Sequence, residues 1–238
     1  MYGTHGGGQR FRRILRRDLV ITTPASDLHL LTDTERRVAA GLEPDDASQD
    51  IELEARSLTV AANIVNECRI AVGRGADPTL KKETLTETFY GVHNEVLRLA
   101  RRHNISIASL TVDGSVLPAM QYLVDPESGV LTQLSTDGIN VLDWVASKIV
   151  VVYDAGLADP VPGDLKQAAK NYFNSITLEL THDPAVTSES VEVPGLETRR
   201  TDFGGKSLFP RSGATATPTT LPPGIGTMLT RYRNVLVA

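Results

Sequence analysis

The spacing of hydrophobic residues changes twice along the chain and separates helical from strand-forming regions. Between residues 44 and 73 it repeats every three or four positions, as in an amphipathic helix of roughly seven turns. The apolar positions are Ile51, Ala55, Leu58, Ala62, Val65, Cys68 and Val72. Pro44-Asp45-Asp46 supplies a favoured start and Gly73 a favoured end for this helix. A shorter helix is expected over residues 27–41.

Residues 79–157 contain shorter apolar segments that are rich in β-forming residues and separated by turn residues. The segments expected as strands are 84–92, 105–112, 120–124, 130–134 and 149–153. Asp113-Gly114 and residues 126–129 are the turn signals between them. Residues 97–102 are also compatible with a short helix. The last segment, Ile-Val-Val-Val-Tyr, is continuously apolar, which predicts a strand buried on both faces.

Helical spacing returns after Pro162, and this helix is expected to end before Asp183-Pro184. Residues 183–220 are rich in Pro, Gly, Ser and Thr and predict a long extended loop. A short helix is expected over residues 225–233. Helical segments thus stand before and after a β-rich segment, which predicts the α+β fold class. In order, the expected parts are a basic N-terminal arm (1–23), the first part of the helical core (24–78), the β-rich insertion (79–157), the second part of the helical core (158–182), the extended loop (183–220), and the C-terminal helix and tail (221–238).

Charge is distributed unevenly along a chain whose net charge is −5. Five arginines precede the first acidic residue, and they are Arg10, Arg12, Arg13, Arg16 and Arg17. Residues 43–54, in contrast, contain six acidic residues and no basic one. A basic arm on an acidic body favours docking to an acidic neighbour, including another copy of the chain. The acidic residues themselves are expected to stabilise the start of the long helix.

The sequence carries no pattern that is typical of an enzyme, a cofactor site or a metal site. Its single cysteine, Cys68, excludes an internal disulfide. The five histidines lack metal-ligand spacing, and neither a phosphate-binding glycine loop nor a nucleophile elbow occurs. No catalytic, cofactor-binding or metal-binding residue is therefore predicted. No apolar run is long enough to span a membrane and no signal-peptide pattern occurs, so we expect a protein that is made and kept in a cytosol-like compartment.

Four short motifs follow one another along the chain. They are Glu43-Pro44-Asp45-Asp46 before a helix that ends in Val72-Gly73-Arg74; Tyr122 with Asp125–Leu131 and Ser135; Val150–Gly156 before Val161-Pro162 and Leu165–Ala168; and Leu221-Pro222 to Leu229 with Tyr232-Arg233. In this order they resemble the head–tail adaptor (connector) proteins of long-tailed double-stranded DNA phages, in the subgroup with a β insertion. The arginine-rich arm and residues 183–220 depart from the family's pattern.

The resemblance implies a small helical bundle with an inserted antiparallel β subdomain. It also implies a structural protein of the virion neck, at the head–tail junction. It implies a homo-oligomeric ring, roughly twelve-fold, that binds below the portal protein, extends the DNA channel and offers a docking platform for a stopper or tail-completion protein. Genomic DNA would pass through the lumen without sequence-specific binding, and no membrane, cofactor or catalysis is implied. If the acidic residues of 43–54 do more than stabilise their helix, they would line this lumen and let the DNA slide. The alternatives are a tail-completion or stopper protein of the same neck, and a DNA-binding regulator that uses the basic arm.

Two segments are candidates for contacts with partners. The arginines of the arm would pair with carboxylates of a neighbouring subunit or of the portal, and the alternative is a solvated basic tail. In the C-terminal helix, Met228, Leu229 and Tyr232 would insert into a groove of the portal, with Arg231 and Arg233 at its rim. The alternative for this helix is that it packs on its own bundle.

Overall fold

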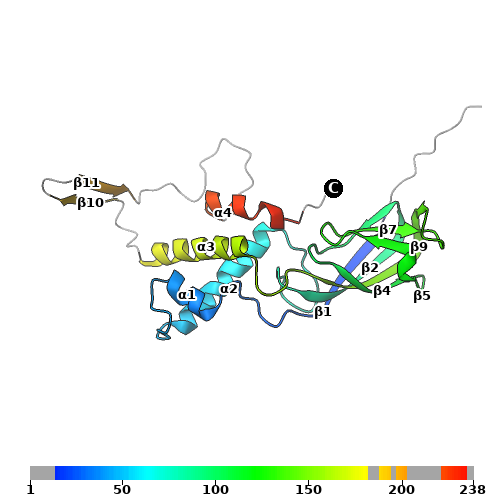
Figure 1. Cartoon of the computed structure of the whole chain (residues 1–238), viewed down its shortest axis with the longest axis horizontal. Helices are drawn as coiled ribbons and strands as arrows, with labels where there is room; N and C mark the ends of the chain where they lie inside the picture. The colour runs from blue at the N-terminus through cyan, green and yellow to red at the C-terminus, as the bar shows by residue number, and fades with distance from the viewer. Residues whose placement is uncertain (1–13, 182–187, 194–196, 203–220, 235–238) are drawn as a thin grey trace, which may run out of the picture. The chain divides into compact units, whose positions relative to one another are not determined.

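Helices and strands occur in similar shares in the computed structural model, which describes residues 14–181, 188–193, 197–202 and 221–234 (Figure 1). Helix accounts for 29% and strand for 32%, and the sheets are antiparallel, which confirms the predicted α+β class. Two compact units form. The β unit comprises residues 14–27, 70–160 and 234, and the helical unit comprises residues 28–69 and the described part of 161–233.

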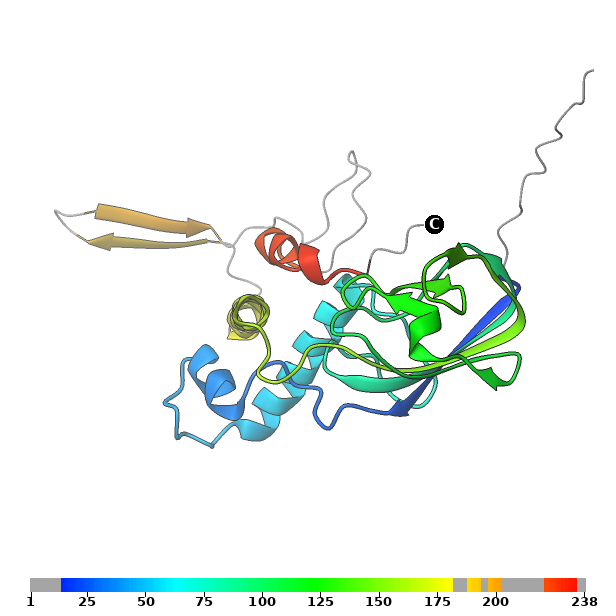
Figure 2. The ribbon, with the colours of Figure 1, turned by 45° about the vertical axis from the view of Figure 1, so that its right-hand side comes forward.

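Two antiparallel sheets make up the β unit (Figure 2). The larger sheet has the strand order β1 (Arg16–Thr23), β2 (Glu83–Asn94), β9 (Trp144–Ala155), β4 (Ser106–Val112) and β5 (Ser115–Val116). The smaller sheet has the order β3 (Val96–Arg98), β7 (Val130–Leu134) and β6 (Tyr122–Val124), with β8 (Val141–Leu142) also paired to β7 and the 3-10 turn η1 (Ala119–Gln121) before β6. Side chains from both sheets form one core, which includes Leu85, Phe89, Leu131, Trp144, Ile149 and Tyr153.

The burial of strand β9 corrects the prediction that both of its faces are covered. Ile149, Val151 and Tyr153 are fully buried, whereas Val150 and Val152 are half-buried. The strand lies between β2 and β4 in an antiparallel sheet, and such a sheet can cover a core with one face while the other stays partly open. The continuous apolar run therefore marks the centre of the sheet without requiring a second covered face.

Local backbone geometry explains two turns of the β unit. Asp113 and Gly114 have φ values of 49° and 86° and join β4 to β5 in a tight hairpin, as predicted. Gly156, just after β9, has a φ of 113°, and a Cβ there would lie 2.2 Å from the carbonyl oxygen of Lys81. Only glycine fits at this position. Residues 97–102 do not form the short helix that was one option, because Val96–Arg98 pairs with β7.

In the helical unit, α1 (Asp33–Ala39), α2 (Asp50–Glu67) and α3 (Gly163–Thr181) contact one another pairwise. The short helix α4 (Pro223–Met228) packs against α3 and is followed by the 3-10 turn η2 (Thr230–Tyr232). Thr32 and Glu35 form a capping box that fixes the start of α1. The buried apolar residues of this unit include Leu53, Val60, Ile64, Leu165, Ala168, Ala169, Phe173, Ile225 and Leu229.

Helix α2 is shorter at both ends than the hydrophobic spacing predicts. Before it, residues 44–45 and 48–49 form turns, and the Ser48 amide donates to Asp46 Oδ1 at 2.9 Å. After it, Arg69 has a φ of 54°, and a residue in this conformation ends a helix. The helix therefore stops before Gly73. Cys68, its C-cap residue, is fully buried.

Two ranges that the sequence assigns to an arm and a loop contain strands. Residues 16–23, from the predicted arm, form β1 and pair with β2. Within residues 183–220, β10 (Ser188–Val193) and β11 (Glu197–Asp202) form an antiparallel pair. The sequence between them contains Pro194-Gly195, a turn dipeptide that could have indicated a hairpin. The prediction of an uninterrupted extended loop was therefore wrong for these two strands.

Candidate interaction surfaces

The C-terminal segment is anchored inside the helical unit. Tyr232 is 1% exposed and donates its hydroxyl to Asp164 Oδ1 at 2.6 Å, and Leu229 is fully buried. Burial and this hydrogen bond raise the pKa of Tyr232. The same hydrogen bond lowers the pKa of Asp164. This packing is what the own-bundle interpretation expects, because Leu229 and Tyr232 already have partners.

The other three candidate residues of this segment lie closer to the surface. Arg231 has a side chain that is 68% exposed and forms an ion pair with Asp164 at 3.1 Å. Arg233 pairs with Glu67 at the end of α2. Met228 is half-buried. Of the five predicted contact residues, Arg231 is therefore the one that the helical unit leaves most open to a partner.

The arginines of the arm are not brought together as one basic cluster in the described residues. Arg10, Arg12 and Arg13 lie outside the described residues. Arg16 pairs with Asp18 at 2.9 Å. Arg17 donates to Glu87 and, at 2.9 Å, to the carbonyl oxygen of Arg98. Strand β1 thus already uses two of the five predicted docking arginines.

A buried polar network, which the sequence analysis missed, ties the loop after β3 to the core of the β unit. Glu87 is fully buried and accepts hydrogen bonds from Arg17, from the Ala100 amide at 2.9 Å and from Tyr153 Oη at 2.9 Å. A second buried pair, Glu83 and Arg101, lies 3.0 Å apart. Burial raises the pKa of Glu83. Both glutamates occupy inward positions in the alternation of β2, the signal that could have identified them.

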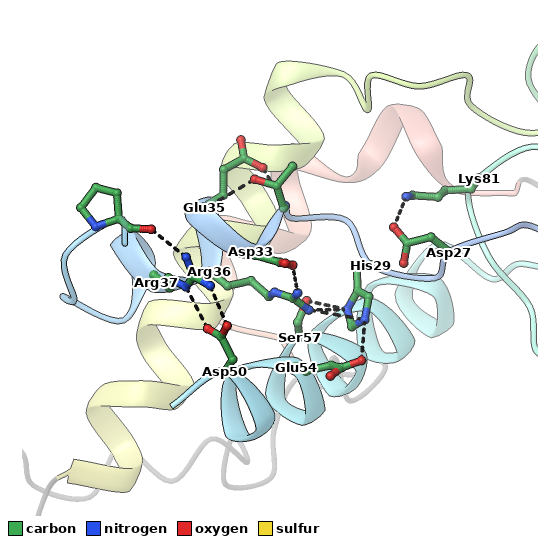
Figure 3. A network of polar contacts seen from close by, with 12 residues as sticks. Asp27, His29, Asp33, Glu35, Arg36, Arg37, Asp50, Glu54, Ser57 and Lys81 are labelled. Carbon is green, nitrogen blue, oxygen red and sulfur yellow. Dashed lines mark hydrogen bonds and ion pairs between the residues drawn. The ribbon is translucent and has the colours of Figure 1, made fainter. Parts of the chain in front are cut away.

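Ion pairs bind several of the charged side chains around α1 (Figure 3). Arg37 donates to both carboxylate oxygens of Asp50, at 2.8 and 2.6 Å, and to the carbonyl oxygen of Pro44 at 2.9 Å. The Arg37 guanidinium lowers the pKa of Asp50. Arg36 binds Asp33 and lies 3.1 Å from His29 Nδ1. One acid of the 43–54 cluster is therefore used to hold the loop before α2.

Glu35 joins α1 to α3. Its carboxylate lies 3.2 Å from the ammonium groups of both Lys166 and Lys170. Burial alone would raise the pKa of Glu35, but the Thr32 amide and the two lysines outweigh it and lower the pKa to about 2. The carboxylate is ionised at any physiological pH.

The exposed face of α2 corrects the predicted helix orientation. Leu53, Val60 and Ile64 are buried, whereas Ile51 is 85% exposed and Leu58 is 39% exposed. Of the apolar positions that the spacing selected, Val65 and Cys68 are buried as expected. The prediction was wrong for the first half of the helix, where Ile51, Ala55, Leu58 and Ala62 form an exposed apolar stripe and a second set of apolar residues faces the helical unit. We call these four residues the α2 stripe.

A second exposed apolar surface lies on the smaller sheet of the β unit. Leu123 and Val141 are 63% and 66% exposed. They lie on the outer face of β6 and β8, where Leu123 is opposite Thr132 and Val141 is opposite Leu134 of β7. Ile139, in the turn before β8, is 77% exposed. Clustered exposed apolar side chains of this kind are typical of protein contact sites.

The described residues offer little for other kinds of site. No group of three or more His, Cys, Asp and Glu side chains among them could hold a metal ion. No helix in the described ranges is long and apolar enough to cross a membrane. Burial raises the pKa of the Cys68 thiol to about 12, so it stays protonated at neutral pH.

Comparison with known proteins gives a likeness in fold. No family model and no curated protein matches the chain. A solved chain from the neck of an empty gene transfer agent particle, computed with sixfold symmetry, matches with a TM-score of 0.54 and 16% identity, covering 92% of this chain and 97% of that one. A chain in the virion of a native gene transfer agent particle matches with a TM-score of 0.51, the same identity and the same coverage. The likeness extends over nearly the whole of each chain.

Proposed function

We propose that the chain is a structural protein of the neck of a phage-like particle, and more specifically a head–tail adaptor that forms a ring below the portal protein. The observation that carries this proposal is the likeness in fold to a neck chain over 92% of this chain and 97% of the other. The order of sequence motifs, which resembles that of head–tail adaptors, supports the finer assignment. A ring of twelve copies is compatible with the sixfold symmetry named for the neck structure.

The mechanism of an adaptor is geometric. A closed ring needs each subunit to present two different, complementary surfaces, because head-to-tail contacts repeat around an axis. The α2 stripe and the outer face of the smaller sheet are exposed surfaces that a neighbouring subunit or a docked neck protein would cover. The genome would pass through the lumen, and a stopper or tail-completion protein would bind the ring from below.

Deletion of the coding sequence tests this function. Particles produced without the chain should contain heads and tails that are not joined, and expression of the chain from a second locus should restore joined particles. Fully joined particles in the deletion strain would refute the proposal. A gel shift with duplex DNA at about 0.15 M salt separates the adaptor from a DNA-binding regulator, because a regulator would retain affinity at that salt concentration and the free adaptor should not.

A further inference from the structure

The α2 stripe is a narrow apolar strip on an exposed helix face. Successive residues of an α-helix are rotated by about 100°, which places Ile51, Ala55, Leu58 and Ala62 within an arc of about 60°. All four are exposed, Ile51 at 85% and Leu58 at 39%. The helix buries its other apolar side chains against its own unit, so nothing in the described helical unit covers the stripe.

Negative charge borders this strip. On the same helix, Glu52 and Glu54 lie on opposite sides of the stripe at the same end of α2, and both are exposed. Glu43 and Asp45, in the loop before α2, are also exposed, while Arg37 in this region is already bound to Asp50. The α2 stripe therefore combines an apolar centre with an acidic border, which suits a segment that is apolar and basic.

The chain contains such a segment at its N-terminus. Residues 9–14 read Gln-Arg-Phe-Arg-Arg-Ile, so that two apolar side chains alternate with three arginines. At the point where the described residues begin, Ile14 and Leu15 are 36% and 59% exposed. Arg16 and Arg17 belong to β1 and have partners within their own chain. The residues before them have the apolar and basic composition that docking to the α2 stripe requires.

We propose that residues 9–14 of one copy of the chain bind the α2 stripe of a second copy. This inference rests on the proposed function, because a ring needs one surface that donates and a different one that accepts. Phe11 and Ile14 would cover the apolar centre, and the arginines would form charge-assisted hydrogen bonds with the glutamates at its border. An apolar core with a polar rim is the usual anatomy of a protein interface.

Cysteine cross-linking between two differently labelled chains tests the contact. One full-length chain carries Gln9→Cys and the other carries Thr59→Cys, an exposed position of α2 beside the stripe. The two chains are mixed and treated with a short bis-maleimide, both as purified proteins at high concentration and after incorporation into particles. The unmodified chain is the blank, because its one cysteine, Cys68, is fully buried. The expected product is a heterodimer of the two variants.

Substitutions on the stripe show whether the cross-link reports this contact. Ile51→Asp with Leu58→Asp should reduce the yield at least tenfold, the change expected for losing about one buried aliphatic side chain. Val116→Asp is the matched control, because Val116 is an apolar residue of the β unit that is 72% exposed, and it should leave the yield unchanged. Glu52→Lys with Glu54→Lys should lower the yield, and adding Arg12→Glu with Arg13→Glu to the partner chain should restore it.

The outcomes separate this inference from the proposed function. Heterodimers that depend on the stripe support the inference. A chain that carries both cysteines shows whether the cross-link forms within a single chain. If only this intramolecular product forms, the inference is overturned. It is also overturned if no cross-link forms either between the purified proteins or in particles. Neck localisation is measured separately in particle images. A chain that is missing from the neck but forms the heterodimer as a purified protein would therefore refute the function and keep the contact.

Discussion

Substitution of Tyr232 by phenylalanine tests whether one side-chain hydrogen bond holds the C-terminal segment in the helical unit. The hydroxyl donates to Asp164 Oδ1 at 2.6 Å, and the ring is 1% exposed. A hydrogen bond to a charged group contributes about 1.5–3 kcal/mol to stability. The Asp164 side chain is 39% exposed, so we expect the lower end, about 1.5 kcal/mol. Phenylalanine keeps the buried ring, and no cavity adds to this loss.

Two probes in the same urea titration report the loss. Far-UV circular dichroism follows the helices, whereas the fluorescence of Trp144, the single tryptophan, follows the β unit. The helical transition of Tyr232→Phe should move to lower urea, by an amount that corresponds to a loss of about 1.5 kcal/mol in the free energy of unfolding. Tyr90→Phe is the control, because it removes a hydroxyl from a ring that contacts Arg16 and Lys148 through its face. An unchanged helical midpoint for Tyr232→Phe would refute the anchoring role.

The pH dependence of this difference has a defined direction. The carboxyl of Asp164 has a lowered pKa, so its contribution is present above the unfolded value of about 3.8 and is lost as pH falls through the folded pKa. The phenol of Tyr232 has a raised pKa, so its contribution is present below about 10 and is lost as pH rises further. The stability difference between wild type and Tyr232→Phe should therefore be constant between about pH 5 and 9 and should shrink in acid.

Three other substitutions test the remaining polar contacts and one turn. Glu87→Gln should lower the free energy of unfolding of the β unit by about 2–3 kcal/mol, because it removes a buried charge that accepts hydrogen bonds from three donors. Unfolding in urea followed by Trp144 fluorescence measures this loss, and an unchanged stability would contradict the role of Glu87. Gly156→Ala should cost about 2–3 kcal/mol in the same assay, through strain and contact with the backbone. The wild-type helical unit should lose stability, as measured by circular dichroism, when pH falls from about 4.5 toward 2 and the Glu35 carboxylate becomes protonated. Glu35→Gln should not show this loss. If the two proteins lose stability equally in acid, the ion pairs of Glu35 do not contribute to stability.

Most helices and strands could be predicted from hydrophobic period and turn residues. Strands β2, β4, β6, β7 and β9 follow from their β-forming runs, and Asp113-Gly114 forms the hairpin turn that its sequence indicates. The short strands β3, β5 and β8 were not predicted. The ends of α2 could not be predicted from Pro44 and Gly73, because the turn at Asp46 and the left-handed conformation of Arg69 depend on local hydrogen bonds and backbone geometry. Element boundaries are thus set by contacts that hydrophobic spacing does not encode.

Which face of an element is buried was harder to predict than its existence. Helix α2 has two apolar stripes, and only the positions of α1 and α3 decide that Leu53 and Ile64 are inside while Ile51 is outside. The same ambiguity hid the buried glutamates of β2, which sit at inward positions among apolar residues. The C-terminal candidate residues were predicted on one helix over residues 225–233, and the structure divides this segment into α4 and the 3-10 turn η2. The partner of Tyr232 is Asp164, about seventy positions away in sequence, which spacing alone does not indicate.

Imaging of the particle neck by cryo-electron microscopy tests the central claim most directly. The account predicts a ring of identical subunits between head and tail, around the channel through which the genome leaves, with density into which both units of this chain fit. It also predicts that the ring disappears when the coding sequence is deleted. Particles whose necks are fully accounted for by other proteins, or a chain located away from that vertex, would contradict the account.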